Sequence, residues 1–172
     1  MIRNLMIVVG VCIICVLLGY ALVAIMKPQS HTITVAKQGQ PMADFSFTDI
    51  DGNDHDFTDF KGRHVLVHFW ASWCAPCVAE FPDLVKMAEK NADNVVVLAF
   101  SWDKKKEPMD RFLSKNVKNI PNNMIIIQKD SQKIAQDMFG TFQLPETYVY
   151  LPDGTLKSKI VGAYAEWDDE VF

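Results

Sequence analysis

The 172-residue sequence has few cysteines and lacks the motifs that would assign them to a metal or a haem. Its four cysteines form two C-x-x-C pairs, Cys12/Cys15 and Cys74/Cys77. A structural zinc site needs about four ligands, and the globular part has no third cysteine. Val78 rather than histidine follows Cys77, which excludes a C-x-x-C-H haem attachment site. We therefore expect no metal and no haem.

Basic residues are outnumbered by acidic residues beyond the first 27 positions. Without Arg3 and Lys27, 15 of the 17 basic residues remain against 21 acidic residues, a net charge of −6. Proteins that bind nucleic acid carry a basic patch, so we expect no nucleic acid partner. The sequence has no internal repeat and no low-complexity tract, which leaves one globular domain plus an appendage for this length.

The appendage is the segment without charges. Residues 5–26 form an uncharged run of 22 residues. As a helix this run would span about 33 Å, enough for a hydrocarbon core about 30 Å thick. We interpret residues 1–27 as a signal anchor in the cytoplasmic membrane, with Arg3 inside and the globular part outside. The alternative is a cleaved signal peptide, whose apolar region is usually about 7–15 residues and ends at a small-residue site.

The first cysteine pair lies inside this apolar run. Formation of a thiolate in hydrocarbon is strongly disfavoured, so we interpret Cys12 and Cys15 as small apolar residues of the membrane helix. Val11 and Ile14 precede them, where a lipid-modified cysteine would follow a small residue. We expect no lipid modification.

The rest of the chain reads as a tether followed by one domain. Residues 28–40 contain Pro, Ser, Gln and Gly without helical periodicity, which predicts a tether to a domain at residues 41–172. Residues 45–60 alternate apolar and polar positions around an Asp-Gly-Asn turn signal, which predicts a β-hairpin. Apolar runs at 64–71 and 94–101 enclose a helical pattern, which predicts two parallel buried strands.

The second half of the domain continues the alternation of helices and strands. Proline and glycine signals separate short apolar runs, and Pro152-Asp153-Gly154 marks a second hairpin. The predicted elements are a helix at 107–116, a strand at 124–128, a short helix from 131 to about 139, hairpin strands at 146–151 and 156–161, and the first turns of a final helix at 167–172.

The chemistry is expected at Trp73-Cys74-Ala75-Pro76-Cys77, between a strand and a helix. The spacing allows the two sulfurs to close a disulfide at the first helical turn. Unpaired N–H groups and the helix dipole favour the Cys74 thiolate there and can lower a cysteine pKa to about 3.5–7.5. We interpret Cys74 as the exposed nucleophile and Cys77 as the resolving cysteine. A purely structural disulfide is the alternative, but this spacing closes too small a loop to stabilise much.

HFWASWCAPC, with Pro82 five residues on, resembles the thioredoxin superfamily. The flanks MADFSFTDIDGNDHDFTDFKG and FGTFQLPETYVYLPDGTLKSKIVGAY resemble its membrane-anchored TlpA/ResA/CcmG-type thiol–disulfide oxidoreductases, over about residues 40–170. The resemblance implies an α/β thioredoxin-like fold with a central mixed sheet and helices on both faces. It also implies an N-terminal hairpin extension and an insertion around residues 116–139.

The resemblance further implies a substrate-docking surface. Pro145 would be a cis-proline facing the cysteines, and the backbone of Leu144 would pair with an incoming peptide. Trp73, Ala75 and Pro76 would form the rest of that surface. A trans turn at Pro145 and a half-buried core position for Trp73 are the alternatives.

Three further residues have two interpretations each. Glu80 would lie near Cys77, with its pKa raised by burial, and accept or relay its proton; otherwise it is an exposed first-turn residue. Glu146 would shape an acidic groove near the site, or be a solvated strand-start residue. His68 stands where cytoplasmic thioredoxins carry a buried aspartate; it would relay protons or be a hydrogen-bonded core residue.

The function implied is that of an extracytoplasmic protein-disulfide reductase with no cofactor beyond the Cys74–Cys77 disulfide. A membrane thiol transporter of the DsbD/CcdA kind would supply electrons, and oxidised exported proteins such as apocytochrome c would receive them. A disulfide-forming oxidant or isomerase on the same fold is one alternative, since potentials span about 150 mV. A non-catalytic assembly module is another. A peroxidase is disfavoured because Ala71 stands where peroxiredoxins carry Thr or Ser.

Overall fold

The computed structural model describes residues 36–164, 167, 171 and 172. The predicted signal anchor at residues 1–27 and most of the predicted final helix at 167–172 lie outside these residues. Among the described residues, no helix combines the length and the apolar character needed to cross a bilayer. The anchor therefore stays a prediction.

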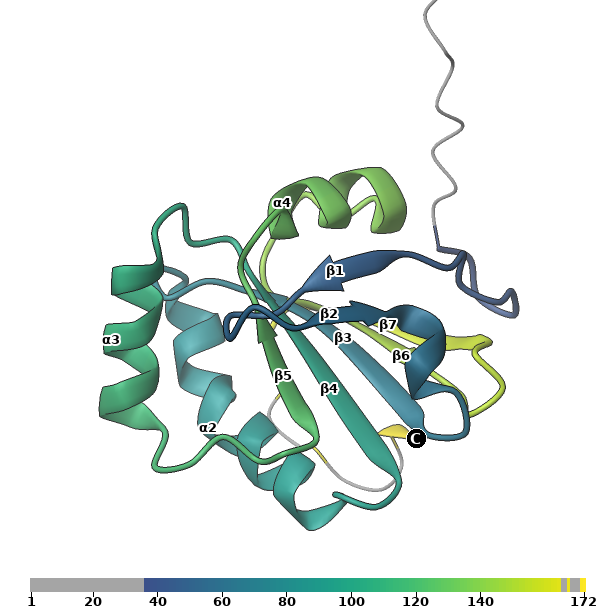
Figure 1. Ribbon diagram of the computed structural model, residues 1–172, viewed down its shortest axis with the longest axis horizontal. Coiled ribbons are helices and arrows are strands. Elements are labelled where there is room, and N and C mark those ends of the chain that lie inside the picture. Colours follow the sequence, from purple (N-terminus) through teal and green to yellow (C-terminus); the bar gives the residue numbers. More distant parts are fainter. Residues whose placement is uncertain (1–35, 165–166, 168–170) are drawn as a thin grey trace, which may run out of the picture. The chain divides into compact units, whose positions relative to one another are not determined.

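A five-stranded mixed sheet forms the centre of the domain, in the order β5-β4-β3-β6-β7 (Figure 1). The first three strands of that order are mutually parallel, whereas β6 is antiparallel to β3 and β7 is antiparallel to β6. The bounds are β3 (His64–Trp70), β4 (Val95–Ser101), β5 (Met124–Ile127), β6 (Glu146–Tyr150) and β7 (Leu156–Val161).

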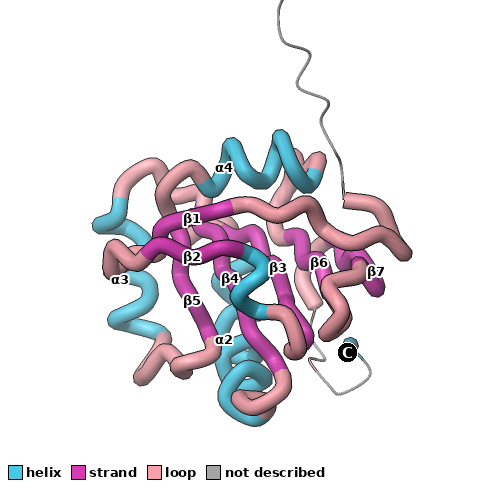
Figure 2. Tube along the Cα trace, turned by 45° about the vertical axis from the view of Figure 1, so that its right-hand side comes forward, coloured by secondary structure: helices cyan, strands magenta, loops and turns pink. Residues whose placement is uncertain are grey.

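Both faces of the sheet are covered, which explains why β3 and β4 read as nearly continuous apolar runs. Helices α2 (Ala75–Lys90) and α3 (Lys106–Asn116) pack on one face through residues such as Phe81 and Met109. Figure 2 shows the hairpin of β1 and β2 and the helix α4 on the other side of the sheet. The bounds on that side are β1 (Ser46–Thr48), β2 (Asp54–Asp56), a 3-10 helix (Phe57–Phe60), α4 (Ser131–Ile134) and a π-helical turn (Ala135–Phe139).

This architecture confirms the predicted thioredoxin-like α/β fold with its mixed sheet and N-terminal hairpin. The predicted tether differs from the structure at its end. Residues 36–40 already bond to the domain: the Gly39 N–H donates to the Leu156 carbonyl at 2.9 Å, and the Leu156 N–H donates to the Gln40 carbonyl at 3.0 Å. The physical reason is that β7 is an edge strand, whose backbone groups are open to pairing at its start.

The site lies where β3 ends and α2 begins, and the segment before β6 reaches the same end of the sheet. Gly140, with φ 63°, ends the π-helical turn in the left-handed region that glycine adopts readily. The chain then runs through residues 141–145, and the Leu144–Pro145 peptide bond is cis, as predicted. β6 begins directly after it and pairs with β3.

Candidate active site

The two cysteines of the motif form a disulfide at the start of α2. Their sulfurs are 2.03 Å apart. Cys74 is the N-cap of the helix, and the Cys77 N–H donates to its sulfur at 3.3 Å. The first turn of α2 carries no acidic residue, and Pro76 lies within it. The positive end of the helix dipole therefore faces Cys74 without an opposing side-chain charge from that turn.

One part of the prediction for the cysteines is wrong. Cys74 was expected to be exposed, but only 7% of its surface is accessible, and Cys77 is completely buried. The physical reason is that the disulfide draws Cys74 against the apolar cluster that includes Trp70 and Phe81. The order of accessibility still favours Cys74 as the sulfur that a partner reaches first.

Glu80 lies one helical turn after Cys77 and points inward, with 5% of its surface accessible. The alternative of an exposed first-turn residue is wrong. The Tyr164 N–H donates to Glu80 Oε2 at 2.7 Å. The other oxygen, Oε1, lies 3.7 Å from Nε2 of the fully buried His68. Among the described residues, neither of these two atoms has a hydrogen-bond partner.

The second ring nitrogen of His68 is engaged. His68 Nδ1 lies 2.9 Å from the hydroxyl oxygen of Thr147, which stands directly opposite it on β6. His68 is thus a hydrogen-bonded core residue, as one of its two interpretations expected. It also faces Glu80, so the structure brings together the two residues that the sequence suggested for proton transfer.

Burial changes the titration of both groups. It raises the pKa of Glu80 to about 7, against the opposing effect of the Tyr164 N–H bond. Burial lowers the pKa of His68 to about 3. At neutral pH the imidazole is therefore uncharged, while Glu80 is near its titration midpoint. A group at its midpoint can both accept and release a proton.

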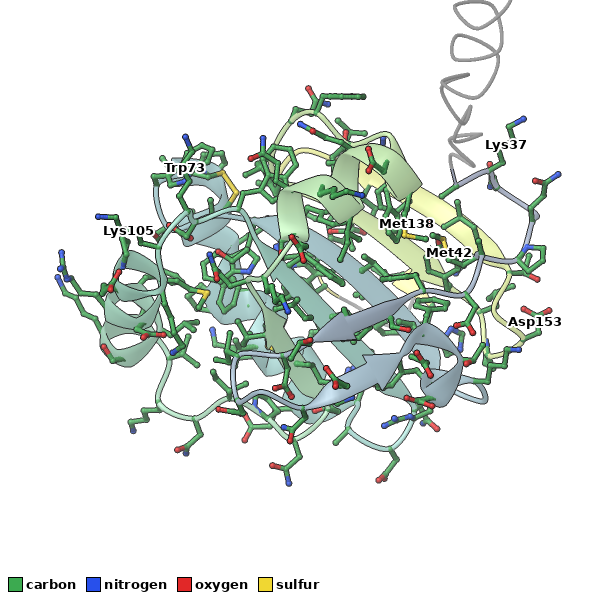
Figure 3. All side chains as sticks on the ribbon, turned by 45° about the horizontal axis from the view of Figure 1, so that its top comes forward. Lys37, Met42, Trp73, Lys105, Met138 and Asp153 are labelled. Carbon is green, nitrogen blue, oxygen red and sulfur yellow. A yellow bond between two sulfur atoms is a disulfide. The ribbon has the colours of Figure 1, made fainter. Side chains whose placement is uncertain are left out.

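Residues of the predicted docking surface lie around the disulfide. Trp73 is 65% exposed, so a half-buried core position for it is wrong. Figure 3 shows it beside the disulfide, at the margin of the domain. Ala75 and Pro76 are exposed as well. Leu144 is half-buried, and among the described residues its backbone N–H and carbonyl have no hydrogen-bond partner. They are free to pair with an extended peptide.

Sequence reasoning missed two residues at this site. Phe142, which is 74% exposed, lies in the same loop as Leu144, and its only signal was a large apolar residue in a predicted loop. Thr147 contacts His68 through strand register, which no local pattern reveals.

Glu146 differs from both of its interpretations. It is 3% exposed, so it is not solvated and does not place a charge on an open groove. Its carboxylate accepts the Thr141 hydroxyl at 2.6 Å and pairs with Lys159 Nζ at 3.0 Å. The reason is the alternation of β6: Thr147 faces α2, so Glu146 faces the opposite side, where it joins the Tyr148 hydroxyl.

No group of three or more His, Cys, Asp and Glu side chains within the described part of the chain is arranged to hold a metal ion. The chemistry that the residues around the motif offer is that of the cysteine pair and the buried carboxyl group of Glu80. This arrangement suits exchange of a disulfide with a dithiol, with Glu80 close to the buried cysteine.

Comparison with known proteins agrees with this chemistry. Residues 38–159 match the AhpC/TSA family. The thiol-disulfide oxidoreductase ResA of Geobacillus thermodenitrificans is 28% identical over 154 residues, which cover 88% of this chain and 83% of that protein. The thioredoxin-like protein YneN of Bacillus subtilis is 28% identical over 157 residues, covering 90% and 89%.

Solved structures of thiol–disulfide interchange proteins and thioredoxins share this fold. The structure of a putative thiol:disulfide interchange protein DsbE from Chlorobium tepidum superimposes with a TM-score of 0.64 at 25% identity, covering 75% of this chain and 88% of that one. The pneumococcal exposed lipoprotein thioredoxin Etrx1 superimposes with a TM-score of 0.60 at 26% identity, covering 75% and 96%. The chain belongs to the AhpC/TSA family and is a thioredoxin-like thiol–disulfide oxidoreductase.

Proposed function

We propose that this oxidoreductase is a reductase of protein disulfides outside the cytoplasmic membrane. The observation that carries the proposal is the buried carboxyl of Glu80, near its titration midpoint, one helical turn after the resolving cysteine. The reduced protein must deprotonate Cys77 within an apolar cluster, where a nearby base is needed because charge is costly there.

The proposed reaction moves two electrons to the partner. The Cys74 thiolate attacks one sulfur of the partner's disulfide, forms a mixed disulfide and releases the partner's other sulfur as a thiolate. Cys77 then gives its proton to Glu80 and attacks the Cys74 sulfur. The bond between Cys74 and the partner breaks as the Cys74–Cys77 disulfide forms. The partner's two sulfurs leave as thiolates and become a dithiol by taking up the proton on Glu80 and one proton from solvent. The cysteine pair is itself the electron carrier, with no other cofactor.

The docking surface supports a protein substrate in an extended conformation. The backbone of Leu144, which has no hydrogen-bond partner within residues 36–164, 167, 171 and 172, offers main-chain hydrogen bonds. Trp73 offers apolar contact next to the disulfide. Ala75 and Pro76 are exposed, uncharged residues between the two cysteines. Pro145 lies directly after Leu144 in the same loop. The proposed substrates are exported proteins with oxidised cysteine pairs, including apocytochromes c.

The source of electrons follows from the proposed location. The extracytoplasmic space is oxidising, so a reductase there needs electrons from across the membrane. A membrane thiol transporter would reduce the Cys74–Cys77 disulfide by the same exchange in reverse. The uncharged run at residues 5–26 would keep the domain at the membrane surface.

The reduction potential of the Cys74–Cys77 couple tests the direction of electron flow. The full chain, kept in a mild detergent, is equilibrated with glutathione or dithiothreitol buffers and read by thiol trapping and mass. Cys12 and Cys15 are changed to serine so that only the Cys74–Cys77 pair contributes to the measured potential. A potential of about −270 to −220 mV supports the reductase, whereas a value near −120 mV refutes it in favour of a disulfide-forming oxidant.

A further inference from the structure

A buried carboxylate outside α2 holds the residue that leads into the cysteine motif. The backbone N–H of Ser72 donates to Asp103 Oδ2 at 2.8 Å, and the Ser72 hydroxyl donates to Asp103 Oδ1 at 2.6 Å. Asp103 is 3% exposed. One carboxylate therefore binds both polar groups of a single residue, two positions before Cys74.

Asp103 is itself fixed by neighbouring elements. The Ser101 hydroxyl, at the end of β4, donates to Asp103 Oδ2 at 2.7 Å and accepts the Asp103 N–H at 3.1 Å. The side chain of Gln128, after β5, donates to the Asp103 carbonyl. The carboxylate is thus anchored to β4 and β5, whereas its ligand Ser72 belongs to the short connection between β3 and α2.

Backbone hydrogen bonds also hold this connection: the Trp102 N–H donates to the Trp70 carbonyl at 2.8 Å, and the Val78 N–H donates to the Cys74 carbonyl at 3.0 Å. The Cys74 N–H donates to the Ala71 carbonyl at 3.1 Å, which closes a turn around Ser72 and Trp73. Trp73 is 65% exposed, so packing does little to hold it. The disulfide ties Cys74 to α2 in the oxidised protein. Reduction removes that bond but leaves the backbone hydrogen bonds in place. The Asp103–Ser72 pair then holds the approach to Cys74 through side-chain hydrogen bonds.

We infer that Asp103 is a positioning residue for the dithiol state, which keeps Cys74 at the N-terminus of α2 after the disulfide opens. The inference uses the redox site of the proposed function but holds for either direction of electron flow. The Cys74 thiolate gains from helix N–H groups only while it stays at the N-cap, because that stabilisation falls off within one turn. A Cys74 that drifts outward becomes an ordinary thiol and reacts more slowly at neutral pH.

The Asp103→Asn variant separates positioning from charge. An asparagine has one carbonyl oxygen and cannot accept from the Ser72 N–H, the Ser72 hydroxyl and the Ser101 hydroxyl at once. Loss of positioning disfavours the Cys74 thiolate and moves its titration midpoint to higher pH. Loss of a negative charge would by itself favour the thiolate and move the midpoint to lower pH. The two explanations therefore predict opposite signs.

The experiment follows the alkylation of Cys74 by iodoacetamide against pH in the reduced full chain, again with Cys12 and Cys15 changed to serine. We expect Asp103→Asn to raise the pH midpoint of Cys74 alkylation by about one unit. Below the midpoint, alkylation should then be roughly tenfold slower, since each pH unit changes the thiolate fraction about tenfold. Ser72→Ala removes only the hydroxyl bond and should give a smaller change in the same direction. It also replaces Asp103→Asn if that variant does not fold.

Asp49→Asn is the matched control. Asp49 is another carboxylate with several hydrogen bonds, from the backbone N–H groups of Asp51 and Asn53 and from His55, in the β1–β2 turn. Its replacement should destabilise the fold without moving the midpoint. An unchanged midpoint in both Asp103→Asn and Ser72→Ala, a shift to lower pH, or an equal shift in Asp49→Asn would overturn the inference. An oxidising potential with the expected alkylation shift would refute the reductase and leave the inference standing.

Discussion

Replacing Glu80 by glutamine should abolish the pH dependence that this residue gives to stability. Glutamine has nearly the same shape, keeps an acceptor for the Tyr164 N–H and adds a donor toward Nε2 of His68. What it removes is the ability to ionise. Glu80 has a folded-state pKa of about 7 against 4.5 for an exposed carboxyl, so between those pH values the folded state binds more protons than the unfolded state. The free energy of unfolding therefore falls as pH rises through that window.

The size of the effect follows from the two pKa values. Each pH unit between them corresponds to about 1.4 kcal/mol, so above pH 7 the Glu80 carboxylate costs the folded protein about 3 kcal/mol. Relative to wild type, Glu80→Gln should therefore gain about 3 kcal/mol of stability between pH 4.5 and pH 8. That gain is a large part of the stability of a small domain, which is about 5–15 kcal/mol.

His68 has the opposite effect on the pH dependence of stability, over an overlapping pH range. Its pKa is lowered from 6.5 to about 3, so between those values the folded state binds fewer protons and stability rises with pH. Between pH 4.5 and 6.5 the contributions of His68 and Glu80 cancel in the wild type. Glu80→Gln should therefore show stability that rises with pH up to 6.5, whereas His68→Asn should show stability that falls with pH from 4.5 to 7.

Urea unfolding of the oxidised protein at half-unit steps from pH 4 to pH 8, followed by tryptophan fluorescence, measures these slopes. Glu89→Gln, an exposed glutamate on the same helix, is the matched control and should follow the wild type. The reasoning fails if the stability difference between Glu80→Gln and wild type stays constant across this range, because the carboxyl would then titrate alike in the folded and unfolded states.

Two further predictions concern residues around the cis-proline loop. Lys159→Met should lower the free energy of unfolding by about 3 kcal/mol at pH 7, measured in urea, because it leaves the buried Glu146 carboxylate without its cation. The double variant Lys159→Met/Glu146→Gln should recover most of that stability, and no recovery would contradict the pairing. Phe142→Ser should leave the urea midpoint unchanged, since the Phe142 side chain is 74% exposed. It should raise KM for a cysteine-containing peptide disulfide several-fold. Ile120→Ser changes another exposed apolar residue and is the control; equal KM values in the two variants would rule out a docking role for Phe142.

The sequence predicted those features that depend on local pattern. Strand β3, the motif after it and α2 follow from an apolar run, a C-x-x-C spacing and helical periodicity, and the structure places them within one or two residues of the expected bounds. The inward orientation of Glu80 also follows locally, because it lies three residues after the buried Cys77 on the same face of the helix.

Features that depend on tertiary pairing were beyond local reasoning. The burial of Glu146 depends on which face of the sheet its β6 position occupies and on Lys159 from the neighbouring strand. Three lysines follow Asp103 in the sequence and are exposed, yet its own carboxylate is buried against Ser72, 31 residues earlier in the chain. Single-sequence patterns report how exposed a segment is on average, whereas these contacts are set by which segments meet.

The pairing of β6 with β3 connects the two halves of the proposed mechanism. His68 stands opposite Thr147, which fixes one ring nitrogen and leaves the other facing Glu80. The same register brings the cis-proline at 145 to the end of β3 from which the chain leads to Cys74. A slip of one residue would turn Thr147 to the opposite face, and His68 would lose its partner while the docking loop moved along the strand. The proposed proton transfer by Glu80 and the proposed peptide docking at Leu144 therefore both depend on the register of β6 against β3.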